Sequence, residues 1–175
     1  MSPPIGDCPH LFQRICFIQW KNLHLCGAGG MHHKFIQCKP LWRGRMARCD
    51  TVLVLLDNSL HGMHGMLVAW VLLLFLFHDV YLDKDFSCAL VNWFIPTYDE
   101  PDEATGMWVV EPKLKDSTRT IEVIHLDAIA RVIHLLPVYG SGYLPEDFHY
   151  LFSLDSFKTY FVNHYINHHA HEFLT

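Results

Sequence analysis

The stretch "MLVAWVLLLFLF", residues 66–77, decides the fold, because it is long, strongly apolar and free of charge. Such a run fits a membrane segment, a buried helix, or a strand covered on both faces. A spanning helix needs about 20 apolar residues, and this run is shorter. Gly62 and Gly65 precede it and His78 follows it. We therefore predict a buried strand, and keep a membrane anchor over residues 63–82 as an alternative.

Other short segments on both sides of this run also have the composition of strands. They are rich in β-branched residues and are separated by turn residues such as Asn, Asp, Gly and Pro. A helix after Asp127 is an alternative for the last of them, but its β-branched residues and Pro137 favour a strand. The segments are residues 50–57, 86–96, 106–112, 119–126 and 128–140.

The C-terminal segment shows a different periodicity. Ser153 and Asp155 are residue types that commonly cap the N-terminus of a helix. Apolar and aromatic residues then recur at helical spacing, which predicts an amphipathic helix over residues 153–174. The stripe consists of Leu154, Phe157, Phe161, Tyr165 and His168.

These segments predict a mainly β protein with a C-terminal α-helix. The close spacing of the strands is typical of a small antiparallel barrel or sandwich, SH3-like or similar. We divide the chain into an N-terminal arm of low order at residues 1–40, a β-rich domain at 41–150 and a helix packed on it at 151–175. The glycine stretch "GAGG" (27–30) lacks the spacing of a phosphate-binding loop, so we interpret it as a flexible turn.

Charge and cysteine content limit the class of protein. The whole chain has a net charge of -5, which does not favour a nucleic-acid-binding protein. Five of the six cysteines lie in the first fifty residues, and none forms a CxxC pair. The start of the chain has no signal-peptide pattern. We therefore predict reduced thiols in an intracellular protein of the nucleus or cytoplasm, with a disulfide framework as the minor alternative.

Three motifs together resemble the C-terminal region of proteins encoded by fungal DNA transposons. They are "DEPDEATGMWVV" (99–110), "VIHLDAIARVIHLLPVYG" (123–140) and "FVNHYINHHAHE" (161–172). The similarity is to the Plavaka and Kyakuja–Dileera–Zisupton type of mushroom-forming fungi, and it covers about residues 40–175. The resemblance implies a transposon-derived chain. The catalytic, metal-binding domain of such transposases is a separate one, so no catalytic residue carries over.

The same resemblance implies a strand at residues 66–77. In the related proteins this strand has a basic residue near the position of Trp70 and a small polar residue near that of Leu76. This chain is apolar at both positions, so we expect an unusual packing contact or plain sequence decay there.

The basic residues of the first fifty are the first candidate site. Residues 1–50 carry a net charge of +5, whereas the rest of the chain carries -10. The segment 34–48 could contact nucleic acid, although a solvated surface is the more ordinary explanation. The candidate residues are Lys34, Lys39, Arg43, Arg45 and Arg48.

Histidines and tryptophans provide two further candidate sites. His164, His168 and His171 would lie on one side of the predicted helix and could bind zinc, although a polar helix end is the simpler explanation. An aromatic cage for a methylated lysine could use the three tryptophans of the β-rich domain, which more commonly serve as core residues. These tryptophans are Trp70, Trp93 and Trp108.

Carboxylates provide no catalytic constellation. The acidic loop "DEPDE" (99–103) has no calcium-loop spacing, and we interpret it as solvated. His125 and Asp127 are more typical of a structural hydrogen bond than of a catalytic pair. The sequence therefore predicts a protein that is not an enzyme and has no cofactor, with a role in protein or chromatin interaction. Contact with nucleic acid through residues 34–48 and membrane association through 63–82 remain as alternatives.

Overall fold

The computed structural model describes most of the chain between residues 33 and 165. The described residues are 10–11, 16–19, 33–42, 46–140, 143–144, 146, 148–149, 152–165 and 174. Their strands are β1 (His10–Leu11), β2 (Cys16–Gln19), β3 (His33–Ile36), β4 (Cys38–Trp42), β5 (Met46–Cys49), β6 (Thr51–Leu55), β7 (Met66–Asp79), β8 (Lys84–Pro96), β9 (Val109–Pro112), β10 (Leu114–Lys115), β11 (Thr118–Arg119), β12 (Ile121–His125), β13 (Ile129–Pro137) and β14 (Tyr160–Asn163). The helical segments in these ranges are η2 (Gly62–Gly65), η3 (Leu126–Ala128) and α1 (Ser153–Ser156).

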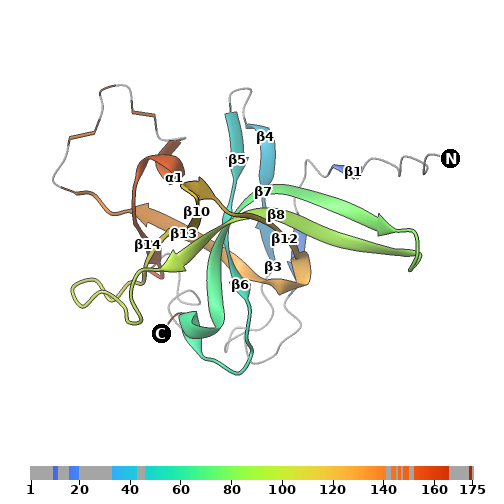
Figure 1. The fold of residues 1–175 in the computed structure, drawn as a ribbon, viewed down its shortest axis with the longest axis horizontal. Helices are drawn as coiled ribbons and strands as arrows, with labels where there is room; N and C mark the ends of the chain where they lie inside the picture. The colour runs from blue at the N-terminus through green and yellow to red at the C-terminus, as the bar shows by residue number, and fades with distance from the viewer. Residues whose placement is uncertain are drawn as a thin grey trace.

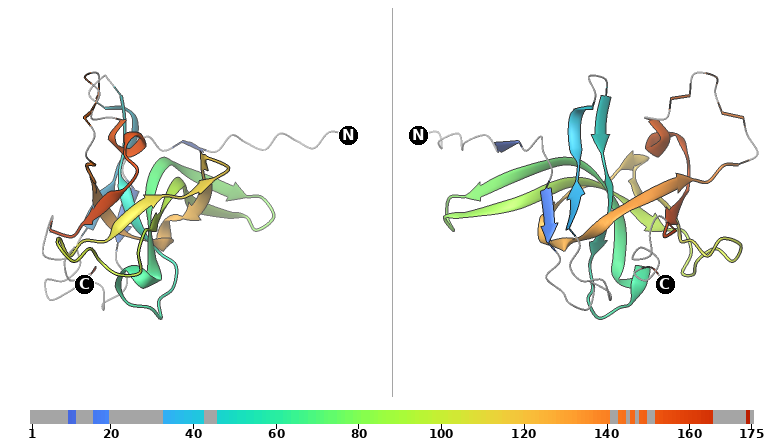
Figure 2. Two further views of the ribbon diagram at one scale, coloured as in Figure 1. Left: turned by 60° about the vertical axis from the view of Figure 1, so that its left-hand side comes forward. Right: turned by 180° about the vertical axis from the view of Figure 1, so that it is seen from behind.

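The largest sheet is antiparallel and curls into an almost closed ring (Figures 1 and 2). Its pairings run from β6 through β7, β8, β9 and β14 to β13, and β13 pairs back with β6. β1 and β12 add to the outer parts of β7 and β8. The mainly β prediction is therefore confirmed, including the preference for a strand at β13.

The opening stretch forms most of β7, as predicted. β7 and β8 form a hairpin that extends well beyond the ring as a curved arm (Figure 1). The register shifts between Val71 and Leu73, which marks a bulge where the ring passes into the arm. We call residues 66–71 and 91–96 the ring half of the hairpin, and residues 73–79 and 84–90 its arm half.

The two faces of this hairpin contribute to two separate core clusters. Because side chains alternate along a strand, Ala69, Val71 and Leu74 lie on one face, which we call the first face. They pack with Ala89, Val91 and Trp93 of β8 and with Ile36 and Leu126. On the opposite, second face, Val68 and Phe94 pack with Trp108, Tyr160 and Val162. Burial on both faces explains why the run is continuously apolar.

Tight connections hold the strands in register. Asp116 and Ser117 both have positive φ, at 51° and 63°, as a two-residue turn between β10 and β11 requires. Gly65 allows a close approach, because a Cβ there would overlap the carbonyl oxygen of Asp57. The carbonyl of Gly65 accepts the N–H groups of Leu56 and Asp57, which closes the loop between β6 and β7.

The predicted C-terminal helix is wrong for the part that the structure describes. Only Ser153–Ser156 is helical, and Tyr160–Asn163 is strand β14 between β13 and β9. Tyr160 and Val162 are fully buried while Phe161 and Asn163 are partly exposed, which is the two-residue alternation of a strand. Residues 166–173 lie outside the described part of the chain.

The prediction of reduced thiols is wrong for one pair. Cys38 and Cys49 lie directly opposite each other on β4 and β5 and form a disulfide, with Cα atoms 4.0 Å apart. Cys88 is a free, buried thiol, and burial raises its pKa. Ile36 is fully buried in the core although it precedes the predicted start of the β-rich domain.

The predicted membrane alternative used residues 63–82, which form η2, β7 and the turn after it. Among the residues that the structure describes, none of the helices has the length and apolar character that a bilayer crossing requires.

Candidate functional site

Of the predicted basic residues, Lys34 belongs to β3, Lys39 to β4 and Arg48 to β5. Lys39 and Arg48 are directly opposite in the register, so their side chains leave the same face of the β4–β5 hairpin. Arg43 and Arg45 lie outside the described residues, as does the side chain of Lys34. The structure therefore brings two of the five predicted basic side chains together.

The predicted histidine site falls mostly outside the described residues. His164 is buried, with its ring 4.1 Å from that of Tyr165, whereas His168 and His171 are not described. Within the described ranges, no group of three or more His, Cys, Asp or Glu side chains could hold a metal ion.

The three predicted cage tryptophans divide between the two core clusters. Trp93 packs on the first face of the hairpin, whereas Trp70 and Trp108 belong to the cluster of the second face. The guanidinium of Arg119 lies 5.7 Å from the centre of a Trp70 ring and 5.3 Å from that of Phe94. Trp70 thus contacts a cationic side chain on the second face.

Two predicted polar features have local structural contacts. The backbone N–H of Asp127 donates to Nδ1 of His125 over 3.2 Å, at the start of η3. In the acidic loop, the Asp102 carboxylate accepts hydrogen bonds from the backbone and hydroxyl of Thr105. Both contacts organise turns.

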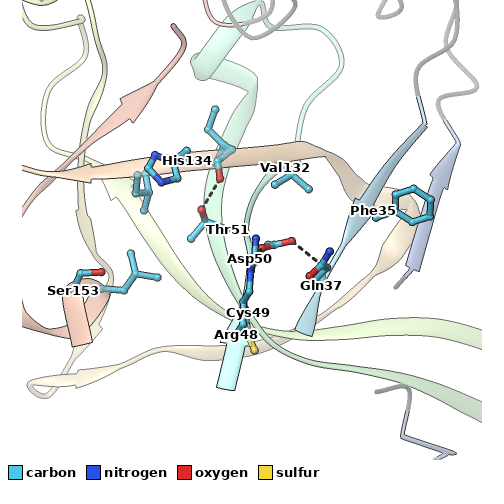
Figure 3. A pocket seen from close by; sticks show the side chains of 12 residues that line it. Phe35, Gln37, Arg48, Cys49, Asp50, Thr51, Val132, His134 and Ser153 are labelled. Atoms are coloured by element: carbon cyan, nitrogen blue, oxygen red, sulfur yellow. Dashed lines mark hydrogen bonds and ion pairs between the residues drawn. The ribbon is translucent and has the colours of Figure 1, made fainter. Parts of the chain in front are cut away.

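An open pocket of about 520 Å³ lies between β3, the junction of β5 and β6, β13 and α1 (Figure 3). Gln37 and Asp50 come from the junctions between strands, and most of the apolar lining residues come from β13 and α1. It is lined by Phe35, Gln37, Arg48, Cys49, Asp50, Thr51, Val132, Ile133, His134, Leu135, Ser153 and Leu154.

Asp50 is the carboxylate of this pocket. One of its oxygens accepts the backbone N–H of Gln37 over 2.8 Å, and the other lies 3.9 Å from Nε of Arg48 (Figure 3). Burial raises the pKa of the Asp50 carboxyl, against the opposing effects of the Gln37 N–H and the Arg48 charge. The pocket thus contains a half-buried carboxylate whose Oδ1 forms a long ion pair with Arg48.

Two further oxygen atoms lie in the pocket wall. The side-chain oxygen Oε1 of Gln37 is buried and has no hydrogen-bond partner among the described residues. The hydroxyl of Thr51 donates to the carbonyl of Ile133 over 2.7 Å, which leaves its oxygen able to accept a bond. The residues that line the pocket therefore supply hydrogen-bond acceptors beside the donors of Arg48.

Hydrogen bonds from Arg119 and Tyr160 fix α1 at its side of the pocket. Arg119 donates to the carbonyl of Leu154 and lies 3.3 Å from the Asp155 carboxylate. The hydroxyl of Tyr160 donates to the carbonyl of Ser153 over 2.8 Å. These bonds fix α1 to the ring, and so position Leu154 in the pocket wall.

A second candidate site is the apolar surface on the second face of the arm half. Phe77, Phe75 and Leu73 of β7 face this way, next to Phe86 and Leu90 of β8. On β12, Val123 lies in the row of Leu90 and Leu73, and Ile121 follows on the same face in the row of Asn92. Phe77 is 48% exposed, Val123 is 57% exposed and Ile121 is 56% exposed. Contiguous apolar surface of this kind commonly marks an interaction site.

β12 also forms an edge of the sheet. In the described part of the chain it pairs with β8 on one side only. Every second residue of an edge strand directs its N–H and C=O groups outward, where another strand can bind them. The apolar surface is therefore continuous with an open hydrogen-bonding edge.

Sequence reasoning missed Asp50, Gln37 and the β12 edge. The alternation in "RTIEVIHL" (119–126) could have indicated Ile121 and Val123 as one face of a strand. No local pattern could have indicated the pocket, because Asp50 and Leu135 meet only through the pairing of β6 with β13.

Comparison with known proteins adds no assignment. No protein-family model matches the chain, and no curated protein or solved structure resembles it at a significant level.

Proposed function

We propose that this chain is a non-catalytic protein-interaction module that binds an extended polypeptide segment along β12. The observation that carries the proposal is the apolar second face of the arm half, which continues into the open edge of β12. An added strand gains backbone hydrogen bonds from the edge and side-chain contacts from the face.

The geometry of the edge defines the partner. A strand added beside β12 places every second side chain on the second face, next to Ile121, Val123 and His125. Two of these neighbours are exposed β-branched residues, which pair well with apolar or aromatic side chains across strands. The partner is therefore an extended segment in which apolar residues alternate with polar ones.

A display library of random linear peptides tests this proposal. We expect selected peptides to share alternating apolar positions, and to protect amides of β12 from hydrogen exchange. Val123→Lys places a charge on the binding face and blocks strand addition, as lysines do on natural edge strands. Because Val123 is 57% exposed, the variant should remain folded. We expect it to lose binding of the selected peptides.

Glu122→Gln is the matched control. Glu122 is the neighbouring residue on β12, directed to the opposite face, and its partner is Lys113 at 3.5 Å. This variant should bind the peptides as the natural chain does. Equal binding by the Val123→Lys variant, or protection confined to another strand, would contradict the proposal.

We further propose that the ring is a partly open barrel of SH3-like size, and that the chain derives from a transposon-encoded protein. The circuit of strand pairings supports the first proposal. The motifs at residues 99–110, 123–140 and 161–172 support the second. A search for terminal inverted repeats in the genomic sequence that flanks the gene tests this origin. Flanking sequence that belongs instead to an unrelated gene family would count against it.

A second candidate function is contact with nucleic acid through the β4–β5 hairpin. The observation in its favour is that Lys39 and Arg48 leave the same face. Binding of this kind should weaken steeply as salt is raised. A fluorescent oligonucleotide titrated with the natural chain and with a Lys39→Gln, Arg48→Gln double variant provides the test. No binding at low salt would remove this candidate.

A further inference from the structure

We propose that the pocket between β6, β13 and α1 binds a primary alkylammonium group, with Asp50 as its counter-ion. This site is separate from the β12 edge, so it does not depend on the proposed binding of an extended segment. The lysine side chain is the common protein group with this chemistry, and free diamines share it.

The polar wall of the pocket fits the donors of an ammonium group. An ammonium has three N–H donors and no acceptor. Asp50 Oδ1, Gln37 Oε1 and the Thr51 hydroxyl oxygen each have acceptor capacity. A bound ammonium would give the half-buried Asp50 carboxylate a second cationic partner besides Arg48. It would also give the buried Gln37 oxygen a hydrogen-bond partner, which removes a cost of burial.

The charges near the pocket favour a cation over an anion. Asp50 has 17% of its side chain exposed, whereas Arg48 has 48% exposed. The carboxylate is thus the more desolvated charge, and an anion placed beside it would be repelled with little screening. His134 also lines the pocket but is exposed. The less exposed of these charges is therefore negative.

The apolar wall fits the stem of a lysine side chain. Val132, Leu135 and Leu154 give the pocket apolar lining. Phe35 lies at its β3 side (Figure 3). A lysine can lay its methylene chain along such a surface while its ammonium reaches a polar group. The pocket volume of about 520 Å³ also leaves room for the adjoining peptide backbone.

A titration of the isotope-labelled chain by nuclear magnetic resonance tests the proposal. The probe is Nα-acetyl-lysine methylamide, and Nα-acetyl-norleucine methylamide is the control with the same stem length but no charge. We expect saturable shifts of the Gln37, Asp50 and Thr51 amides with the lysine compound only. Cadaverine is the free-diamine probe. The cationic probe that binds more tightly identifies the source of the ligand.

Asp50→Asn is the decisive variant, because it removes the charge and keeps an oxygen for the Gln37 N–H. We expect affinity to fall by about tenfold or more, since charge-assisted hydrogen bonds are about twice as strong as neutral ones. Asp127→Asn, at a carboxylate that is 92% exposed and outside the pocket, should leave binding unchanged. Equal binding of the lysine and norleucine compounds, or unchanged affinity in Asp50→Asn, would overturn the proposal.

A pH series of the natural chain covers the case in which Asp50→Asn fails to fold. Affinity for the lysine compound should fall as pH is lowered through the raised pKa of Asp50, because the protonated carboxyl is no longer a counter-ion. His134 and Arg48 are the other charged or titratable residues that line the pocket. A His134→Gln variant should retain the loss near the carboxyl pKa. Affinity that does not change through this range would also overturn the proposal.

Discussion

The ring half and the arm half of the β7–β8 hairpin differ sharply in burial, although the apolar run of residues 66–77 on β7 passes through both. In the ring half, Val68, Val71, Val91 and Phe94 are all fully buried. In the arm half, the same alternation leaves Phe77 48% exposed. The ring half has β6 and β9 along its outer edges and packed residues on both faces.

This difference shows that the neighbours of a strand, and not its own hydrophobicity, decide how much of it is buried. In the arm half the first face is still covered at Leu74, which packs near Ile36 and Cys38. The second face carries the exposed apolar residues. The apolar residues there do not add to the ring core and remain available to a partner.

The largest effect is expected from a matched pair of phenylalanine variants on the second face. Phe94 is fully buried, and its ring meets that of Tyr160 edge-on at 5.5 Å. Phe94→Ala should lower the free energy of unfolding by about 3–5 kcal/mol, as large-to-small core changes do. Phe77→Ala should cost less than about 1 kcal/mol, because the side chain is already half exposed.

Urea unfolding of the natural chain and both variants measures these values. The comparison depends on the difference between the two variants, which also cancels changes common to any Phe→Ala substitution. Similar costs for the two variants would mean that the arm half is packed as tightly as the ring half. The second face of the arm half would then not be free to bind a partner.

Burial of this kind explains which parts of the fold could be predicted. The strand at residues 66–77 followed from its length and its polar ends. The bulge after Val71 could not be predicted, because it depends on pairing with β8. The helix predicted over residues 153–174 was wrong at β14, since Leu154, Phe157 and Phe161 fit a helical stripe as well as Tyr160 and Val162 fit a strand. Tertiary pairing with β13 and β9 decides between them.

The candidate sites were less predictable than the strands for the same reason. Lys39 and Arg48 were identified as a basic segment, but their direct opposition depends on the β4–β5 register. The Cys38–Cys49 disulfide depends on that register too. Asp50 was missed because nothing in its local sequence shows that β13 and α1 lie beside it.

The next effect concerns the loop that leads into the ring half. A Cβ at Gly65 would overlap the backbone oxygen of Asp57, so Gly65→Ala must displace one of the two chain segments. We expect a loss of about 1–3 kcal/mol in the free energy of unfolding, the usual cost of overpacking. Gly140→Ala is the control, because a Cβ there meets no atom within 4 Å. Thermal unfolding of both variants provides the measurement, and equal melting temperatures would show that the loop yields freely.

A smaller effect is expected from a hydrogen bond inside the ring. Thr51 donates to the carbonyl of Ile133 over 2.7 Å and so links β6 to β13 through a buried side chain. Thr51→Val keeps the shape and removes the donor, which should cost about 1 kcal/mol. Ser59→Ala removes an exposed hydroxyl that donates to Asp57, and should cost less. Urea unfolding midpoints of the two variants measure these costs. A larger loss for Ser59→Ala than for Thr51→Val would contradict the distinction between buried and exposed hydrogen bonds.

The smallest effect concerns the tip of the arm half, where the bonds are exposed. Nδ1 of His78 lies 2.7 Å from Oδ1 of Asp85, and Nε2 lies 3.8 Å from Asp83. The hydrogen bond to Asp85 raises the pKa of His78 above 6.5, and the nearby carboxylates Asp83 and Asp79 add to this. Because the folded arm favours the protonated imidazole, its contribution is fully present below pH 6.5 and is lost as pH rises through the folded pKa.

A titration of the His78 ring by nuclear magnetic resonance should therefore give a midpoint above 6.5 in the natural chain and a lower one in Asp85→Asn. Amides of the turn at residues 80–83 should exchange faster, after correction for intrinsic rates, once the pH passes that midpoint. Asp99→Asn, in a loop far along the chain, should change neither result. A midpoint at or below 6.5 would mean that the two side chains do not hold their contact in solution. The arm tip would then be looser than the ring in its polar bonds as well as in its packing.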